Sequence, residues 1–169
     1  MNNVFKEIKP TDIPDNVFKL IGDDWMLITS GSSEDYNTMT ASWGGLGVLW
    51  GEPVSFCFIR PQRYTYNFIE KNEKYTLSFF DESHRKALQY CGTHSGRDVN
   101  KASAIGMTVV NGDDNIIYFN EARLVLVCEK MYYQDLIPQN FIDSNIDKNY
   151  AKKDYHRMYV GKITKCLIK

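Results

Sequence analysis

The stretch IIYFNEARLVLVCEKM, at residues 116–131, decides the fold class of this chain. Branched and aromatic side chains dominate it, which is typical of β-strands. It predicts a short strand at 116–119 and a longer one at 122–131, and further strands are predicted at 107–110 and 156–168. The Asn-Gly pair at 111–112 favours a hairpin turn. The last third of the chain is therefore expected to be rich in strands.

Upstream of this region, strands and short helices are mixed. Apolar runs predict further strands at residues 25–29, 37–43, 54–59 and 75–80. Four-residue spacing and capping residues predict short helices at residues 64–72, 83–91 and 98–105. The helices do not alternate regularly with the strands, so a doubly wound α/β sheet is disfavoured. A mainly β fold, a closed antiparallel barrel with short helical insertions, fits better.

Length and composition place the chain among folded globular domains. Its 169 residues are expected to form a single domain, 1–169, and 43% of them are hydrophobic and 14% aromatic. The formal net charge of −1 gives no overall field that would attract nucleic acid or an anionic membrane surface. We therefore expect small-molecule partners and no nucleic-acid or membrane partner.

Cysteine usage and the N-terminal sequence indicate a cytoplasmic protein. The four cysteines are widely spaced and form no CxxC pair, which argues against a zinc site or a thioredoxin-like pair. The opening MNNVFKEIKP lacks the apolar run of a signal peptide, and no stretch is long enough to span a bilayer. A reducing cytoplasm with free thiols is the expected location.

Three polar segments carry the candidate chemistry, and the first is the predicted strand at residues 37–43. It places hydroxyls at Thr38, Thr40 and Ser42 on one face, while Ala41 lets a ligand approach the backbone. Such a row can bind a flat polar ligand. The pattern also fits an edge strand with a solvated face, and the residues alone leave that alternative open.

The second segment is Arg60-Pro61-Gln62-Arg63-Tyr64-Thr65, where a predicted strand passes into a predicted helix. Two guanidinium groups, a hydroxyl and the free amides of a helix N-terminus are suited to binding a phosphate monoester. Ordinary surface arginines would give the same string of residues.

The third segment is Ser95-Gly96-Arg97-Asp98, with Lys101 one helical turn later. Gly96 can expose successive backbone amides, while Arg97 and Lys101 supply positive charge for an anion. A capped helix on the surface is the alternative interpretation.

Other motifs give weaker signals. Gly45-Leu46-Gly47 has neither the third glycine nor the βαβ context of a dinucleotide site. Cys91 and His94 supply only two ligands, which do not make a metal site. No GxSxG or HExxH string occurs, so hydrolase and metalloprotease functions have no support.

Taken in order, these segments resemble the flavin reductase-like family, and in particular its flavoredoxin-type branch. The resemblance runs from about Trp25 to the C-terminus. It is carried by NTMTASWGG at 37–45, FIRPQRYTYNFIEKNEKYTLSFF at 58–80, SGRDVNKASAIG at 95–106 and HRMYVGKI at 156–163.

The resemblance implies an FMN-binding split β-barrel, antiparallel and Greek-key-like, that forms a homodimer with a flavin near each subunit interface. The matching positions fall into three groups. Thr38, Met39, Thr40, Ala41, Ser42 and Trp43 would line the flavin ring; Arg60, Arg63 and Thr65, with Tyr64 beside them, would face the phosphate or the ring edge; Gly96, Arg97, Asp98 and Lys101 would close the remaining side.

The chemistry of FMN agrees with this placement. A phosphate dianion needs cations or helix ends, and a flat ring needs an apolar wall with hydrogen-bond partners along its edge. Negative charge grows at one ring edge on reduction, so a nearby cation raises the reduction potential. We expect Lys101 or Arg97 in that role.

The leading functional hypothesis is an enzyme in which NADH or NADPH passes a hydride to FMN, which then passes electrons onward. His156 is a weak candidate for a proton donor, and a strand histidine packed at the barrel rim is the alternative. A flavoredoxin-like FMN electron carrier that receives electrons from a redox protein partner is a second hypothesis. A pyridoxamine-phosphate-oxidase-like enzyme on the same barrel is a third.

Overall fold

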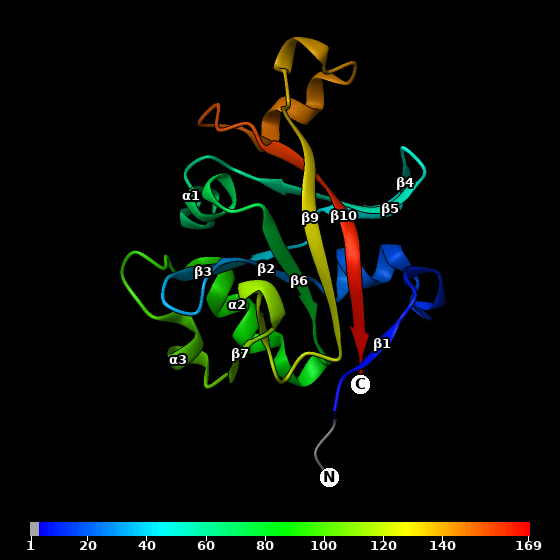
Figure 1. Cartoon of the computed structure of the whole chain (residues 1–169). Coiled ribbons are helices and arrows are strands. Elements are labelled where there is room, and N and C mark those ends of the chain that lie inside the picture. Colours follow the sequence, from blue (N-terminus) through cyan, green and yellow to red (C-terminus); the bar gives the residue numbers. More distant parts are fainter. Residues whose placement is uncertain (1–3) are drawn as a thin grey trace.

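In the computed structural model, which describes residues 4–169, eight strands form one antiparallel sheet (Figure 1). The strand order is β3-β2-β6-β9-β10-β5-β4, with β1 paired to β10. Three of the six neighbouring pairs in this order, β2-β6, β6-β9 and β10-β5, are not consecutive in the chain, as in Greek-key-like connections. The strands of this sheet are β1 Lys6–Ile8, β2 Met26–Gly31, β3 Tyr36–Ala41, β4 Gly44–Leu49, β5 Glu52–Ile59, β6 Lys74–Phe79, β9 Leu124–Asp135 and β10 Arg157–Ile168. The mainly β prediction is confirmed.

Short helices and one small hairpin cover the sheet. The α-helices are α1 Tyr64–Lys71, α2 Arg85–Thr93 and α3 Lys101–Ile105, and the separate hairpin pairs β7 Val109–Asn111 with β8 Ile117–Phe119. Short 3₁₀ segments lie at η1 Pro10–Asp12, η3 Glu82–His84, η4 Asp113–Asn115, η5 Pro138–Asn140 and η6 Ser144–Asn149, and a short π-helical segment lies at η2 Lys19–Asp23. In the described residues no helix is long and apolar enough to cross a membrane.

The two outer strands of the sheet, β3 and β4, follow each other in the chain, and only Ser42 and Trp43 separate them. Each pairs on one side only among the described residues, β3 with β2 and β4 with β5. The sheet is therefore open along a seam between β3 and β4. Gly44 and Gly45, which follow the strand predicted at 37–43, begin β4. A Cβ on Gly44 would lie 2.8 Å from the Phe56 carbonyl oxygen, so this close strand pairing requires glycine.

The hairpin between β7 and β8 turns later than predicted. Gly112 is extended, with φ −82°, whereas Asp114 and Asn115 have φ 57° and 58°. These two residues lie in the loop that is closed by the hydrogen bond from the Gly112 amide to the Ile116 carbonyl at 2.9 Å, and Asp and Asn tolerate the left-handed conformation. The prediction of a turn at Asn111-Gly112 was wrong by three residues.

The mostly apolar interior of the sheet also holds the hydroxyl of Tyr75. This fully buried side chain is 2.8 Å from the Ser55 hydroxyl, which also lies 3.2 Å from the Cys128 sulfur. Gly161 of β10 faces the tyrosine, beside a register shift after Val160. The buried hydroxyl is therefore satisfied only because no side chain projects from position 161.

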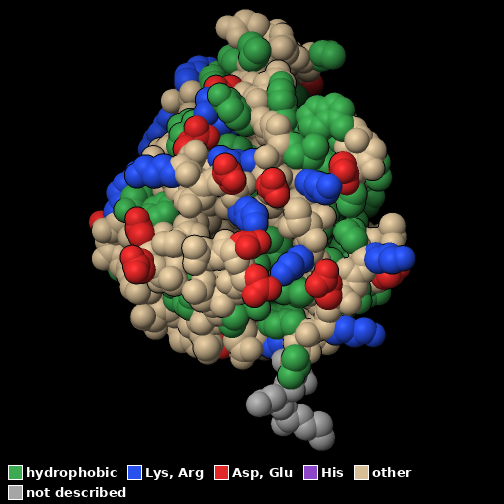
Figure 2. Space-filling view, in the orientation of Figure 1, with side chains coloured by type: hydrophobic (Ala, Val, Ile, Leu, Met, Phe, Trp, Pro, Cys, Tyr) green, Lys and Arg blue, Asp and Glu red, His purple; other side chains and the backbone are tan. Residues whose placement is uncertain are grey.

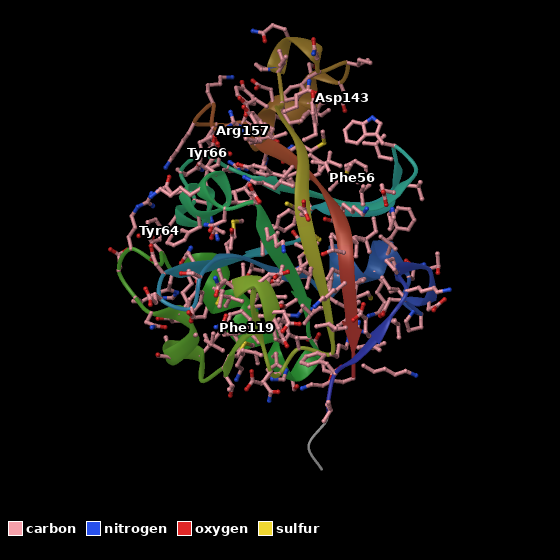
Figure 3. The ribbon with its side chains drawn as sticks, viewed as in Figure 1. Phe56, Tyr64, Tyr66, Phe119, Asp143 and Arg157 are labelled. Atoms are coloured by element: carbon pink, nitrogen blue, oxygen red, sulfur yellow. The ribbon has the colours of Figure 1, made fainter. Side chains whose placement is uncertain are left out.

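Figure 3 shows Arg157, at the start of β10, beside Tyr66 of α1. Its guanidinium lies 5.5 Å from the Tyr66 ring centroid and 4.5 Å from that of Tyr133. It also donates to Asp135 at 2.6 Å and to Glu70 at 3.1 Å. Arg157 therefore connects α1 to the end of β9 and the start of β10 through bidentate hydrogen bonds and aromatic stacking. These contacts hold α1, the helix that begins at the candidate site, in place.

Replacing Gly161 by Ala is expected to lower the free energy of unfolding by about 1–3 kcal/mol, because its Cβ would meet the Tyr75 hydroxyl at 2.3 Å in a closed core. Urea unfolding measures this change. Gly47→Ala is the matched control, since the nearest atom to its Cβ would be in the Phe56 ring at 3.7 Å, an ordinary contact distance. Equal stability of the two variants would show that the Tyr75 contact does not constrain position 161.

Candidate functional site

The seam between β3 and β4 opens into a cavity of about 190 Å³, which we call the seam cavity. Its walls come from the end of β3, the end of β5 and the start of β10. They combine apolar, hydroxyl and cationic side chains from Met39, Thr40, Ala41, Ser42, Trp43, Phe58, Arg60, Arg63 and His156. Seven of these nine residues belong to the set predicted from the sequence, and His156 was a weak candidate. Phe58 is the addition.

A second cavity, of about 170 Å³, lies where α1 begins against the loop before α3, and we call it the junction cavity. Figure 3 shows Tyr64 at this edge of the molecule. Polar and small residues line it: Asn37, Gln62, Arg63, Tyr64, Thr65, Gly92, Thr93, His94, Ser95, Gly96, Arg97 and Lys101. Arg63 lines both cavities, so they are adjacent across one guanidinium-bearing side chain.

An outer cavity of about 350 Å³ shares Asn37, Gly96, Arg97 and Lys101 with the junction cavity. Thr38 and Asp98 line this outer cavity and neither of the other two. The residues predicted from the sequence therefore come together on one side of the barrel, but they divide among three adjoining spaces.

The hydroxyl row on β3 is used mainly within the protein. Thr38 and Thr29 share a hydrogen bond of 2.9 Å between their hydroxyls, and Thr40 donates to the Leu88 carbonyl of α2 at 2.5 Å. Ser42, beyond the end of the strand, lines the seam cavity and is half-buried. The groups that remain accessible to a ligand are therefore the backbone at the end of β3 and the two residues that follow it, Ser42 and Trp43.

The two arginines of the second segment have different partners. Arg60 donates to an Asp154 carboxylate oxygen and to the Asn149 carbonyl, both at 2.9 Å, and stacks 5.0 Å from the Tyr150 ring centroid. Arg63 points the other way and donates to the Gly92 carbonyl at 3.0 Å. Burial, and then the charge of Arg60, lowers the pKa of the Arg63 guanidinium.

The Thr65 side chain, fully buried in the first turn of α1, accepts a hydrogen bond of 2.7 Å from the Asn37 amide. Its own hydroxyl proton is free to donate. Gly96 closes over this pair, because a Cβ there would lie 1.8 Å from the Asn37 amide oxygen. No side chain caps the start of α1. The junction cavity therefore gathers a hydroxyl, helix N-terminal amides and a glycine loop.

Lys101 is buried at the back of the junction cavity, with 5% of its surface exposed. Its ammonium donates to the Thr38 carbonyl at 2.8 Å and to the Cys91 carbonyl at 2.9 Å. Burial lowers the pKa of Lys101 to about 8; Cys91 opposes that shift, and the charge of Arg63 adds to it. The lysine joins β3 to the carbonyl end of α2.

Arg97 lies closer to the surface than Lys101. Its guanidinium stacks 4.7 Å from the Tyr64 ring centroid and donates to the Gln62 carbonyl at 3.3 Å. The remaining donors of the guanidinium fork are available to an anion in the junction cavity. α3 begins at Lys101, so the first residues of the helix predicted at 98–105 form a turn instead, with Asn100 as the cap.

His156 lies at the rim of the seam cavity, just before β10. Its Nδ1 and the Tyr150 hydroxyl share a hydrogen bond of 2.8 Å, and its ring is 5.2 Å from the Trp43 ring. Burial, and then the charge of Arg60, lowers the pKa of this imidazole to about 4. The side chain is therefore neutral at pH 7, so it holds no stored proton there, although one ring nitrogen still carries a hydrogen.

Sequence reasoning missed several residues of the site. Asn37 and Phe58 lie inside the quoted motifs and were within reach of that reasoning. Asp154 and Tyr150 belong to the polar stretch at 135–154, where no local pattern indicates a contact with Arg60. In the described residues no group of three or more metal-binding side chains occurs, and all four cysteines are buried free thiols.

Comparison with known sequences finds one family that spans most of the chain. The profile of the flavin reductase like domain matches residues 20–169. None of the curated proteins matches the sequence significantly.

Solved structures with the same fold are numerous but distant in sequence. An FMN-binding domain of a flavin reductase-like enzyme from Shewanella baltica is 14% identical, with a TM-score of 0.73 over 99% of this chain and 78% of its own. A flavoredoxin from Methanosarcina acetivorans is 22% identical, with a TM-score of 0.68 over 97% and 76%. An NADH:FAD oxidoreductase from Streptomyces globisporus, in complex with NAD and FAD fragments, is 14% identical, with a TM-score of 0.65 over 86% and 74%. At these identities the likeness shows the fold, a split barrel.

The low pKa of His156 gives a testable pH dependence. The unfolded imidazole binds a proton near pH 6.5, whereas the folded one does so only near pH 4, so unfolding takes up a proton between these values. The free energy of unfolding should therefore fall as the pH drops from 6.5 to 4, by up to about 3 kcal/mol. Urea unfolding of the wild type and of His156→Gln over this range isolates the effect. Parallel pH curves for the two proteins would contradict it.

Proposed function

Because the chain belongs to the flavin reductase-like family, we propose that it binds FMN at the seam of its barrel and acts as a flavoprotein oxidoreductase. In this proposal NADH or NADPH donates the hydride, and the electrons then pass onward to an acceptor. The observation that carries the proposal is that a cavity with apolar walls adjoins a cavity lined by polar and small residues across Arg63.

The junction cavity fits the phosphate end of FMN. Gly96 lets the loop backbone lie against the Asn37 amide, where no Cβ would fit, Thr65 has a free hydroxyl proton, and the first amides of α1 lack a side-chain cap. Arg97 adds a cation at the open side. A dianionic phosphate is bound by this combination of helix N-terminus, hydroxyl and guanidinium.

The seam cavity fits the ring end. Trp43 and Phe58 supply apolar walls, while Ser42 and the terminal backbone of β3 supply hydrogen-bond partners. Arg60 brings positive charge to this cavity, whereas Lys101 and Arg97 line the junction cavity instead. We therefore assign to Arg60 the role beside the ring that the sequence had suggested for Lys101 or Arg97.

Bound FMN supplies hydride and electron transfer, and the chain supplies binding, orientation and electrostatics. The Trp43 ring, 47% exposed at the mouth of the seam cavity, offers a flat surface against which a planar nicotinamide can stack. The similar oxidoreductase from Streptomyces globisporus, in complex with NAD and FAD fragments, supports a nicotinamide donor.

An electron carrier is the second candidate function. The similar flavoredoxin from Methanosarcina acetivorans supports it, since that name describes a flavin-bearing redox protein. A neutral His156 is compatible with either function, because electron transfer to a protein partner needs no stored proton at this position.

We also propose that the protein is a homodimer, on the basis of an aromatic patch beside the seam. The patch consists of Val48, Trp50, Met131 and Tyr132, which are 77%, 59%, 42% and 43% exposed. Figure 2 shows hydrophobic side chains gathered at the upper right, beside β4 and β9. Trp50 and Tyr132 form an edge-to-face pair 6.0 Å apart, and exposed aromatic clusters of this kind are enriched at subunit interfaces.

The phosphate assignment predicts a difference between FMN and riboflavin, which lacks the phosphate. Arg97→Gln should weaken FMN binding about tenfold, through loss of a charge-assisted hydrogen bond, and leave riboflavin binding unchanged. Quenching of flavin fluorescence measures both affinities. Arg85→Gln is the control, since Arg85 stacks on Trp25 away from both cavities. An equal loss for both flavins would place Arg97 elsewhere, and no uptake of FMN by the wild type would remove the proposed function.

The choice between enzyme and carrier can be tested by anaerobic mixing of the FMN-loaded protein with NADH or NADPH. Loss of the flavin absorbance within seconds is expected for the reductase. Stopped-flow absorbance at the flavin band records it. Reduction only by a reduced protein donor, with no response to either nicotinamide, would establish the carrier function instead.

A further inference from the structure

The segment that joins β9 to β10, residues 136–156, supplies His156 to the seam cavity and places the Asp154 carboxylate against Arg60. Asp154 accepts a hydrogen bond from Arg60 at 2.9 Å, and its same oxygen, Oδ2, accepts from the Gln62 amide. The carboxylate is mostly buried, with 13% of the side chain exposed. An ion pair so placed is screened little by solvent, so it changes the electrostatic potential at the seam.

Hydrogen bonding alone does not account for a carboxylate at this position. Oδ2 takes both hydrogen bonds, and Oδ1 is buried without a partner among the described residues. Arg60 is also held by the Asn149 carbonyl and by the Tyr150 ring. A neutral amide oxygen would accept the same bonds, and a buried polar atom without a partner calls for an explanation beyond packing.

The charges around the seam cavity show what the carboxylate changes. Arg60 and Arg63 are the cations that line it, and Arg63 is engaged with the carbonyl end of α2. His156 is neutral at pH 7. Asp154 is therefore the negative charge directly paired with the Arg60 guanidinium, and it cancels much of the positive potential that Arg60 would exert in the cavity.

We propose that Asp154 is a positioning residue that holds Arg60 at the seam cavity and, by neutralising its charge, lowers the reduction potential of the flavin bound there. This inference rests on the proposed function. Reduction by two electrons and one proton leaves one negative charge on the ring, which an unpaired Arg60 would stabilise. The paired Arg60 stabilises it less, so the reduced protein is a stronger electron donor.

The test measures the midpoint potential of the FMN-loaded protein by anaerobic titration against a dye of known potential. Asp154→Asn keeps an acceptor oxygen but removes the charge, so the potential should rise. By linkage, the affinity for reduced FMN relative to oxidised FMN should increase on the order of tenfold. Asp154→Glu, which restores the charge, should return the potential toward that of the wild type.

Two further variants separate this electrostatic effect from general damage. Arg60→Gln leaves Asp154 as an unpaired negative charge and should shift the potential in the opposite direction, whereas simple loosening of the site would shift both variants alike. Asp147→Asn is the matched control in the same segment. Its carboxylate pairs with Lys153 at 2.6 Å and lines neither cavity, so the potential should not change.

The outcomes are distinguishable from failure of the proposed function. If Asp154→Asn binds FMN normally and keeps the wild-type potential, the inference is wrong and FMN binding stands. Shifts of the same sign in Asp154→Asn and Arg60→Gln would also overturn it. If the wild type takes up no FMN, the proposed function fails, and the inference fails with it.

Discussion

The candidate site depends on hydrogen bonds from two cationic side chains to the carbonyl groups at the C-terminal end of α2. Arg63 donates to the Gly92 carbonyl and Lys101 to the Cys91 carbonyl, so both cations lie at the negative end of the helix dipole. Lys101 also binds the Thr38 carbonyl of β3. Segments from four parts of the chain are thereby fixed around one helix end, and the junction cavity lies among them.

A second constraint is the open seam of the sheet. Among the described residues β3 pairs with β2 and β4 with β5, and the two strands are not paired with each other although only Ser42 and Trp43 separate them. A closed sheet would use these backbone groups in a ladder, whereas the open seam leaves them at the wall of a cavity. The same break in the barrel therefore provides both the cavity and the polar groups along its edge.

The division of roles among the arginines follows from these two constraints. Arg63 serves the helix end and lies between the cavities, Arg97 covers the open side of the junction cavity, and Arg60 faces the seam cavity with Asp154 behind it. Three similar guanidiniums thus have different electrostatic surroundings. The partner of each cation, more than its presence, determines what it can do to a bound anion or ring.

Patterns in the sequence were enough to predict the mainly β fold, most of its strands and the three segments that gather at the site. Short-range pattern was sufficient for this, because runs of β-branched residues, Pro61 and the change from strand to helix at Arg63 determine the local backbone conformation. It did not determine that Gly44 begins β4, since that depends on close contact with Phe56 across the sheet. Nor did the sequence reveal which cationic side chains are already engaged by other groups of the protein.

The packing of the folded chain was needed to show that Lys101 is buried against two carbonyls and that Arg60 is paired with Asp154, which is 94 residues away in the chain. Hydrogen-bond partners over such separations leave no periodic signal in the sequence, because they arise when strands and loops pack together. The residue types at the site could be predicted from the sequence. Their charges, partners and division between the two cavities could not.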